Sequence, residues 1–218
     1  MSYNRRMNKR KIQKIITKAE LSLIKQLSTP HKVQDFLDTL PFNFEKRGET
    51  YMSPRRVLQA KKAHCFEGAL LAVLALTYHG YENCILDLKV KKSARDDQDH
   101  TLCIFKMNNH WGAISKTNHS VLRWRDPIYR SIRELLMTYF HEYFLNDGGK
   151  TLESYSKPFD IWKRFGTSWI IQEKDLDEVA LKLDKLVHIK FIPKENNKLV
   201  RKVGKTEIKG AAVKEWAI

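Results

Sequence analysis

The stretch KKAHCFEGALLAVLAL, residues 61–76, decides the fold. From about His64 to Tyr78, apolar residues cover every side of a helix, where a surface helix would carry a single apolar stripe. A helix of this kind is buried on all sides, and Gly80 supplies a C-cap that ends it. The stretch therefore predicts a central, buried helix with Cys65 at its N-terminus.

The segments after this helix carry strand and turn signals. NCILDLKV (83–90) and HTLCIFKM (100–107) are short apolar runs, and the polar loop KKSARDDQD separates them. Asn108-Asn109 is a turn signal, and HWGAISKT (110–117) is the returning strand. We expect an antiparallel hairpin packed beside the buried helix.

Apolar periodicity and capping signals predict further helices on both sides of this core. They are a basic helix over about 8–27, a helix over 31–40, a short helix from Pro54, a long amphipathic helix that starts at Asp126-Pro127, and a helix over 175–186. HIKFIP (188–193) is a candidate final strand. The predicted fold class is α+β, with a buried central helix that carries the cysteine at its N-terminus, packed on an antiparallel sheet and flanked by other helices.

Cys65 stands where free backbone N–H groups and the helix dipole favour a thiolate over a thiol. Two lysines and His64 add positive charge nearby, and the same N–H groups can hold the oxyanion that forms when a thiolate attacks a carbonyl. The alternative is a small hydrophobic residue at the start of a buried helix. Cys84 and Cys103 lie within apolar strand-like runs, which is typical of core residues.

A nucleophilic cysteine needs a base, and His100 opens the second strand ahead of an apolar run. A surface or capping histidine is the alternative interpretation. A base of this kind usually has an orienting partner on its other ring nitrogen. If the turn is centred on the two asparagines, Thr117 and Asn118 lie across from His100. This arithmetic favours Asn118 as the partner, and Asp126 is the rival candidate.

The order of these residues resembles the transglutaminase-like superfamily, a branch of papain-like α+β folds. The likeness covers roughly residues 28–145 and rests on the cysteine that starts a buried helix (AHCFEGALLAVLALTYHGYENCILDL) and the histidine that opens a strand (DHTLCIFKMNNHWGAI). The chain is similar to uncharacterised bacterial proteins with SPRRVL, HC-EGA, DH and WGAI-K-N segments. The resemblance implies that Cys65 is a nucleophile and His100 its base.

The third position of the implied triad departs from the family pattern. The family places an aspartate shortly after the tryptophan of the return strand, whereas here Ser115 follows Trp111 at that place and Asn118 is three residues further on. With Asn118 in this role, the arrangement resembles that of papain. The resemblance implies acyl transfer from an amide or ester, as hydrolysis, deamidation or transamidation, with a protein or peptide amide as substrate.

The formal charge of +15 is concentrated in the two ends of the chain. Residues 1–32 contain nine Lys or Arg and one acidic residue, and residues 185–218 contain nine and three. The expected organisation is a basic N-terminal helix or arm (1–27), a transglutaminase-like core (28–145), and a C-terminal extension with a basic tail that packs on the core (146–218).

Two other functions are compatible with the same sequence. The departure at Ser115 is also expected of a non-catalytic binding or scaffolding domain, and the basic ends can contact nucleic acid or an anionic surface. The sequence has no base-reading motif, and no HExxH or paired CxxC pattern that would predict a metal or cofactor. Three cysteines, no long apolar run and no signal-peptide pattern predict a cytoplasmic protein without a membrane span.

Overall fold

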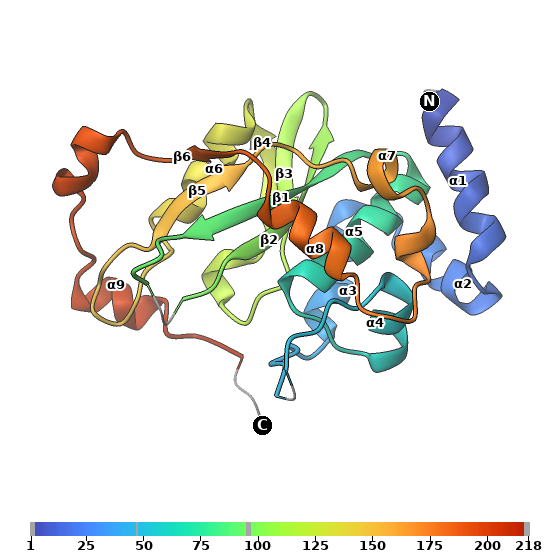
Figure 1. Ribbon diagram of the computed structural model, residues 1–218, viewed down its shortest axis with the longest axis horizontal. Coiled ribbons are helices and arrows are strands. Elements are labelled where there is room, and N and C mark those ends of the chain that lie inside the picture. Colours follow the sequence, from blue (N-terminus) through green and yellow to red (C-terminus); the bar gives the residue numbers. More distant parts are fainter. Residues whose placement is uncertain (1–2, 47, 95–96, 216–218) are drawn as a thin grey trace.

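The computed structural model describes residues 3–46, 48–94 and 97–215. In this part of the chain, six strands form one antiparallel sheet in the order β4-β3-β2-β1-β5-β6 (Figure 1). The strands are β1 (Glu82–Val90), β2 (His100–Met107), β3 (His110–Ile114), β4 (Arg125–Tyr129), β5 (Leu152–Ser156) and β6 (His188–Lys190). Helices cover both faces of the sheet, which confirms the predicted α+β class.

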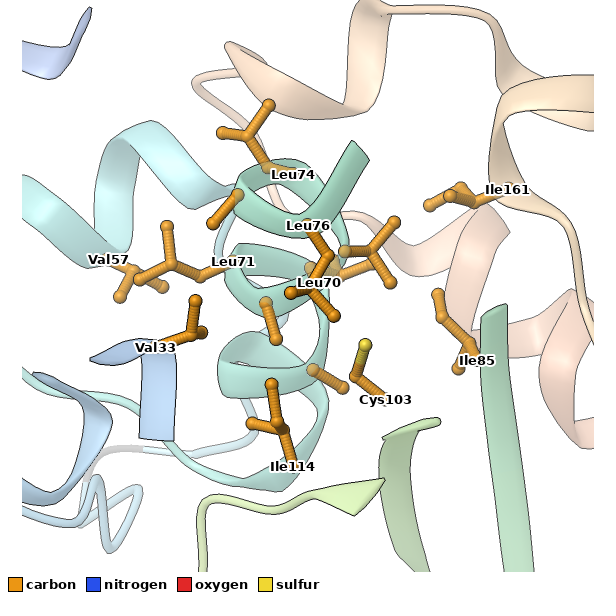
Figure 2. Close-up of a cluster of buried hydrophobic side chains, with 14 of the residues drawn as sticks. Val33, Val57, Leu70, Leu71, Leu74, Leu76, Ile85, Cys103, Ile114 and Ile161 are labelled. Carbon is orange, nitrogen blue, oxygen red and sulfur yellow. The ribbon is translucent and has the colours of Figure 1, made fainter. Parts of the chain in front are cut away.

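The central helix α5 (Cys65–His79) has the predicted burial, because every residue from Phe66 to Tyr78 is buried. Gly80 ends it in the left-handed conformation, at φ 83°. The helix packs on β1 and β2 and is surrounded by α1 (Tyr3–Ile15), α2 (Lys18–Gln26), α3 (Pro30–Thr39) and α4 (Pro54–Ala60). Figure 2 shows the leucines of α5 among side chains from α3, α4 and the sheet.

A second buried cluster fills the opposite face of the sheet. It contains Leu86 and Leu88 of β1, Leu102 and Ile104 of β2, and the buried side of α6 (Ile132–Phe140). Because neighbouring residues of a strand point to opposite faces, β1 and β2 supply both clusters. The sheet is therefore the middle layer of three.

The helix predicted over 8–27 is two helices, α1 and α2. Thr17 separates them, because its hydroxyl accepts the Glu20 N–H at 3.2 Å while the Glu20 carboxylate accepts the Thr17 N–H at 2.6 Å. This reciprocal capping box starts a new helix. Ile12 and Ile24 are both fully buried, so each helix packs on the core.

The prediction that a long helix starts at Asp126-Pro127 is wrong, because these residues lie in the edge strand β4. An edge strand tolerates proline, since proline lacks the N–H that a central strand would need. The helix α6 begins only at Ile132, where the Ser131 hydroxyl accepts the Glu134 N–H at 3.1 Å. Ile128, which a helical pattern would bury, is 65% exposed.

The C-terminal part of the chain contributes to the same sheet. Strands β5 and β6 extend it beyond β1, and β6 lies where the last strand was predicted. The remaining elements are α7 (Ile161–Phe165), α8 (Asp177–Asp184), α9 (Lys205–Gly210) and short 3-10 turns at Ser120–Leu122, Ser168–Ile170 and Lys194–Leu199. Residues 213–215 return to the loop after β3, where the Glu215 N–H donates to the Asn118 carbonyl at 2.8 Å.

The two basic ends of the chain lie far apart. Helix α1 is at one end of the long axis, and α9 lies toward the other end (Figure 1). Among the described residues, no helix combines the length and the apolar character that crossing a membrane requires.

Candidate active site

Cys65 is the first residue of α5 and is half-buried. The first N–H groups of a helix have no partner within it, and they carry the positive end of the helix dipole. The fully buried Glu67 holds this helix start in place. Its carboxylate accepts the N–H groups of His64 at 2.9 Å and Met52 at 3.1 Å, and the Thr50 hydroxyl at 2.9 Å.

His100 opens β2, as predicted, and is 5% exposed. Its Nε2 lies 2.7 Å from the Ser115 Oγ, and the Tyr143 ring lies beside the imidazole, tilted by 49°, with a centroid distance of 6.5 Å. The His100 imidazole also contributes to the lowered pKa of the Cys65 thiol. The structure thus brings Cys65 and His100 together.

Ser115 is fixed by Gln34 of α3. The Ser115 N–H donates to the Gln34 Oε1 at 3.0 Å, and the Gln34 Nε2 donates to the Ser115 carbonyl at 3.0 Å. Both residues are buried. Because β3 ends at Ile114, the backbone N–H and carbonyl of Ser115 hydrogen-bond the Gln34 side chain and not a neighbouring strand. The Ser115 hydroxyl is hydrogen-bonded to His100.

The two predicted partners of His100 make other contacts. The register that pairs Cys103 with Ile114 would bring Thr117 opposite His100, but β3 stops before that point. The Asn118 carbonyl accepts the Glu215 N–H, and the Asp126 carboxylate accepts the Trp124 Nε1–H at 2.8 Å. Within the described ranges, the side chain that hydrogen-bonds the His100 ring is Ser115, where the sequence predicted Asn118 or Asp126.

A second imidazole also lies beside the thiol. His64 is 7% exposed, its Nδ1 is 4.0 Å from the Cys65 Sγ, and its Nε2 is 2.7 Å from the Thr50 carbonyl oxygen. Carboxylate oxygens of Glu67 and Glu45 lie 3.4 and 3.6 Å from this Nε2. The sequence indicated His64 only as nearby positive charge, because no local pattern shows that Glu45 and Thr50 lie against its ring.

The environments of the three cysteines separate them chemically. Burial raises the pKa of the Cys65 thiol, but hydrogen bonds and positive charge from His100 and His64 outweigh it and lower the pKa to about 5. Burial raises the pKa of Cys84 to about 12 and raises that of Cys103 as well. At neutral pH, Cys65 is the thiolate of the three and Cys84 and Cys103 are protonated.

The pKa of His64 moves in the opposite direction. Burial lowers it, but the hydrogen bond and negative charge of Cys65, the charge of Glu67 and the Thr50 carbonyl outweigh burial and raise the pKa to about 9. A thiolate beside the His64 imidazolium at a helix N-terminus is equipped to attack a carbonyl carbon.

In the described part of the chain, no group of three or more His, Cys, Asp or Glu side chains is placed to hold a metal ion. No protein-family model matches the chain, and no curated protein matches its sequence.

Proposed function

We propose that this protein is a thiol acyl-transfer enzyme of the transglutaminase-like kind, which acts on protein or peptide amides through Cys65. The observation that supports this most is the Cys65 thiol at the start of α5, with a pKa of about 5 between two buried imidazoles. The other two cysteines have raised pKa values, so this environment is specific to Cys65.

In the proposed reaction, the Cys65 Sγ attacks the amide carbon and a C–S bond forms. The carbonyl oxygen becomes negative near the first N–H groups of α5, which can hold it. His100 gives a proton to the amide nitrogen, the C–N bond breaks, and the amine leaves. Water or a second amine then attacks the thioester carbon, His100 takes the proton of this nucleophile, and the Cys65 thiolate is released.

Ser115 orients the His100 ring in this scheme. Its hydroxyl is neutral, so it fixes the ring through a hydrogen bond and does not supply the negative charge of a triad aspartate. The presence of a serine in place of a triad aspartate also supports the competing proposal of a non-catalytic binding domain.

Acylation by p-nitrophenyl acetate tests the enzyme proposal. We expect a burst of p-nitrophenolate of about one equivalent per chain, with the acetyl group located on Cys65 by peptide mass spectrometry. The burst should vanish in Cys65→Ala and persist in Cys84→Ala, the matched control with a protonated thiol. No burst from the wild type, or acetyl spread evenly over the cysteines, would favour the binding domain.

The basic ends support a second, separate proposal, that they contact nucleic acid or an anionic surface. Arg10 and Lys11 of α1 and Lys205 of α9 are exposed, and the two helices lie too far apart to form one surface (Figure 1). Binding to a short DNA duplex should then weaken steeply as salt rises. The absence of binding at low salt would remove this proposal.

We also propose that the protein is located in the reducing cytoplasm, because its three cysteines are free.

A further inference from the structure

The negative groups that a triad would place behind its base are found here around His64. His100 has the neutral Ser115 hydroxyl at 2.7 Å. The His64 Nε2 instead faces the Thr50 carbonyl oxygen at 2.7 Å, with the carboxylates of Glu67 and Glu45 beyond it at 3.4 and 3.6 Å. Negative neighbours stabilise an imidazolium, so His64 is the better placed of the two rings to keep a positive charge.

The hydrogen bonds of His64 also decide which of its nitrogens can exchange a proton. A carbonyl oxygen only accepts, so the Nε2 that faces Thr50 carries a hydrogen in both charge states of the ring. The exchangeable proton therefore belongs to Nδ1, and this is the nitrogen that faces the Cys65 Sγ at 4.0 Å.

The backbone fixes this arrangement. His64 is the N-cap residue of α5, and its N–H is held by the buried Glu67 at 2.9 Å. The ring of Phe66 stacks on the His64 ring with a centroid distance of 6.3 Å. The imidazole and the thiol are thus positioned by the same helix start.

We infer that His64 holds the thiol proton in the resting enzyme. The proton passes from the Cys65 Sγ to the His64 Nδ1, which leaves a thiolate beside an imidazolium, and no bond between heavy atoms changes. His64 then stays charged through the cycle, while His100 gives one proton to the leaving amine and recovers one from the attacking water. This assignment rests on the proposed acyl-transfer function and gives its two histidines separate tasks.

The charged groups around the ring agree with this direction. Among the described residues, four negative groups lie near the His64 ring. Cys65 and Glu67 belong to α5, Glu45 lies in the loop before α4, and Asp175 lies in the segment before α8. His100 faces the same thiol from β2 and shares in lowering its pKa.

Alkylation by iodoacetamide, followed at Cys65 by peptide mass spectrometry across a pH series, tests the assignment on the intact chain. His64→Gln keeps an N–H that can reach the Thr50 carbonyl but cannot carry charge. We expect the alkylation midpoint to rise toward the value of a free cysteine, about 8.5, so that the rate at pH 6.5 falls about a hundredfold and recovers at high pH. His100→Ala should retain more of the rate at pH 6.5 than His64→Gln.

His119→Gln is the matched control. Burial and the charge of Lys214 lower the pKa of His119 to about 4, so this histidine is neutral at pH 6.5 and its replacement should leave the Cys65 profile unchanged. A His64→Gln profile that matches the wild type, with a midpoint near 8.5 in His100→Ala, would overturn the inference and make His100 the proton holder.

Glu45→Gln asks the same question if His64→Gln does not fold. It removes one carboxylate from the His64 side and keeps an amide oxygen for the Thr50 N–H, which Glu45 accepts at 2.6 Å. We expect the midpoint to rise by about half a pH unit, and an unchanged midpoint would overturn the inference. Failure of the proposed acyl-transfer function would give a different result. The alkylation midpoint of Cys65 would still be low and would still depend on His64, but p-nitrophenyl acetate would not acetylate Cys65.

Discussion

The His100 ring is hydrogen-bonded to the neutral Ser115 hydroxyl, whereas a triad aspartate would add a negative charge. Its orientation therefore depends on this one hydrogen bond. That serine is in turn held by Gln34, a residue 81 positions away in the chain. Neither contact has a local signal in the sequence. Ser115 stands where the resemblance to the transglutaminase-like superfamily would place an aspartate, but only the fold shows that its hydroxyl bonds the His100 ring.

Ser115→Ala should therefore impair turnover without removing the thiolate. We expect turnover to fall about ten- to a hundredfold, less than the roughly 10²–10⁴-fold that general acid–base catalysis contributes as a whole. The buried His100 nitrogen also loses its partner, so the free energy of unfolding should drop by about 1–3 kcal/mol. Steady-state kinetics and urea unfolding measure the two effects, with the exposed Ser120→Ala as control. Unchanged turnover would contradict an orienting role for the hydroxyl.

His100→Ala should separate two kinds of substrate. With a peptide anilide, the leaving amine needs a proton, and we expect its turnover to fall by about 10²–10⁴-fold. With p-nitrophenyl acetate, the leaving phenolate needs none, so acylation should fall much less. The ratio of the two rates is the measurement, and equal losses would mean that His100 serves only to ionise the thiol.

Among the elements, the central helix and the hairpin were predictable because their signals are local. The apolar run of α5, its stop at Gly80, and Asn108-Asn109, both at positive φ, each report on a few neighbouring residues. Strand β4 was not predictable in this way. Asp126-Pro127 is an ordinary helix start, and only pairing with β3, which sets Trp111 opposite Tyr129, makes this segment a strand.

The contact between α5 and the loop after β3 leads to a stability prediction. A Cβ added at Gly68 would lie 2.5 Å from the Lys116 Cβ. Lys116 is fully buried and its Nζ donates to the Leu40 carbonyl, so a shift of Lys116 would disturb its packing and this hydrogen bond. Gly68→Ala should lower the free energy of unfolding by about 1–3 kcal/mol in urea titrations. Gly210→Ala, which meets nothing within 4 Å, is the control, and equal midpoints for the two variants would refute the packing argument.

At the scale of the whole molecule, charged side chains join the C-terminal extension to the core. The Lys89 Nζ of β1 bonds Asp99, the neighbour of His100, at 2.7 Å and also bonds Asp184 of α8. The His188 Nε2 of β6 lies 3.0 Å from the buried Asp87 carboxylate. These partners are up to 101 residues apart, so the sequence could not show that the extension reaches the strand beside the site.

The His188–Asp87 pair predicts a pH-dependent stability. The hydrogen bond to Asp87 raises the pKa of His188 against the effect of partial burial. Its stabilisation is therefore fully present below the unfolded-state pKa of about 6.5 and is lost as pH rises through the raised folded-state value. His188→Asn should lose more unfolding free energy, relative to the wild type, at pH 5.5 than at pH 9. A difference that does not change with pH would contradict a charged pair.

The two edge strands of the sheet, β4 and β6, affect how readily the protein aggregates at high concentration. Unpaired N–H and C=O groups along an edge strand can recruit another chain and seed aggregates. Here the edge strand β4 is only five residues long and contains Pro127, and β6 is only three residues long and ends at Lys190. The proline that led to the wrong helix prediction thus lies in a short border strand, and both features disfavour fibril growth from that border.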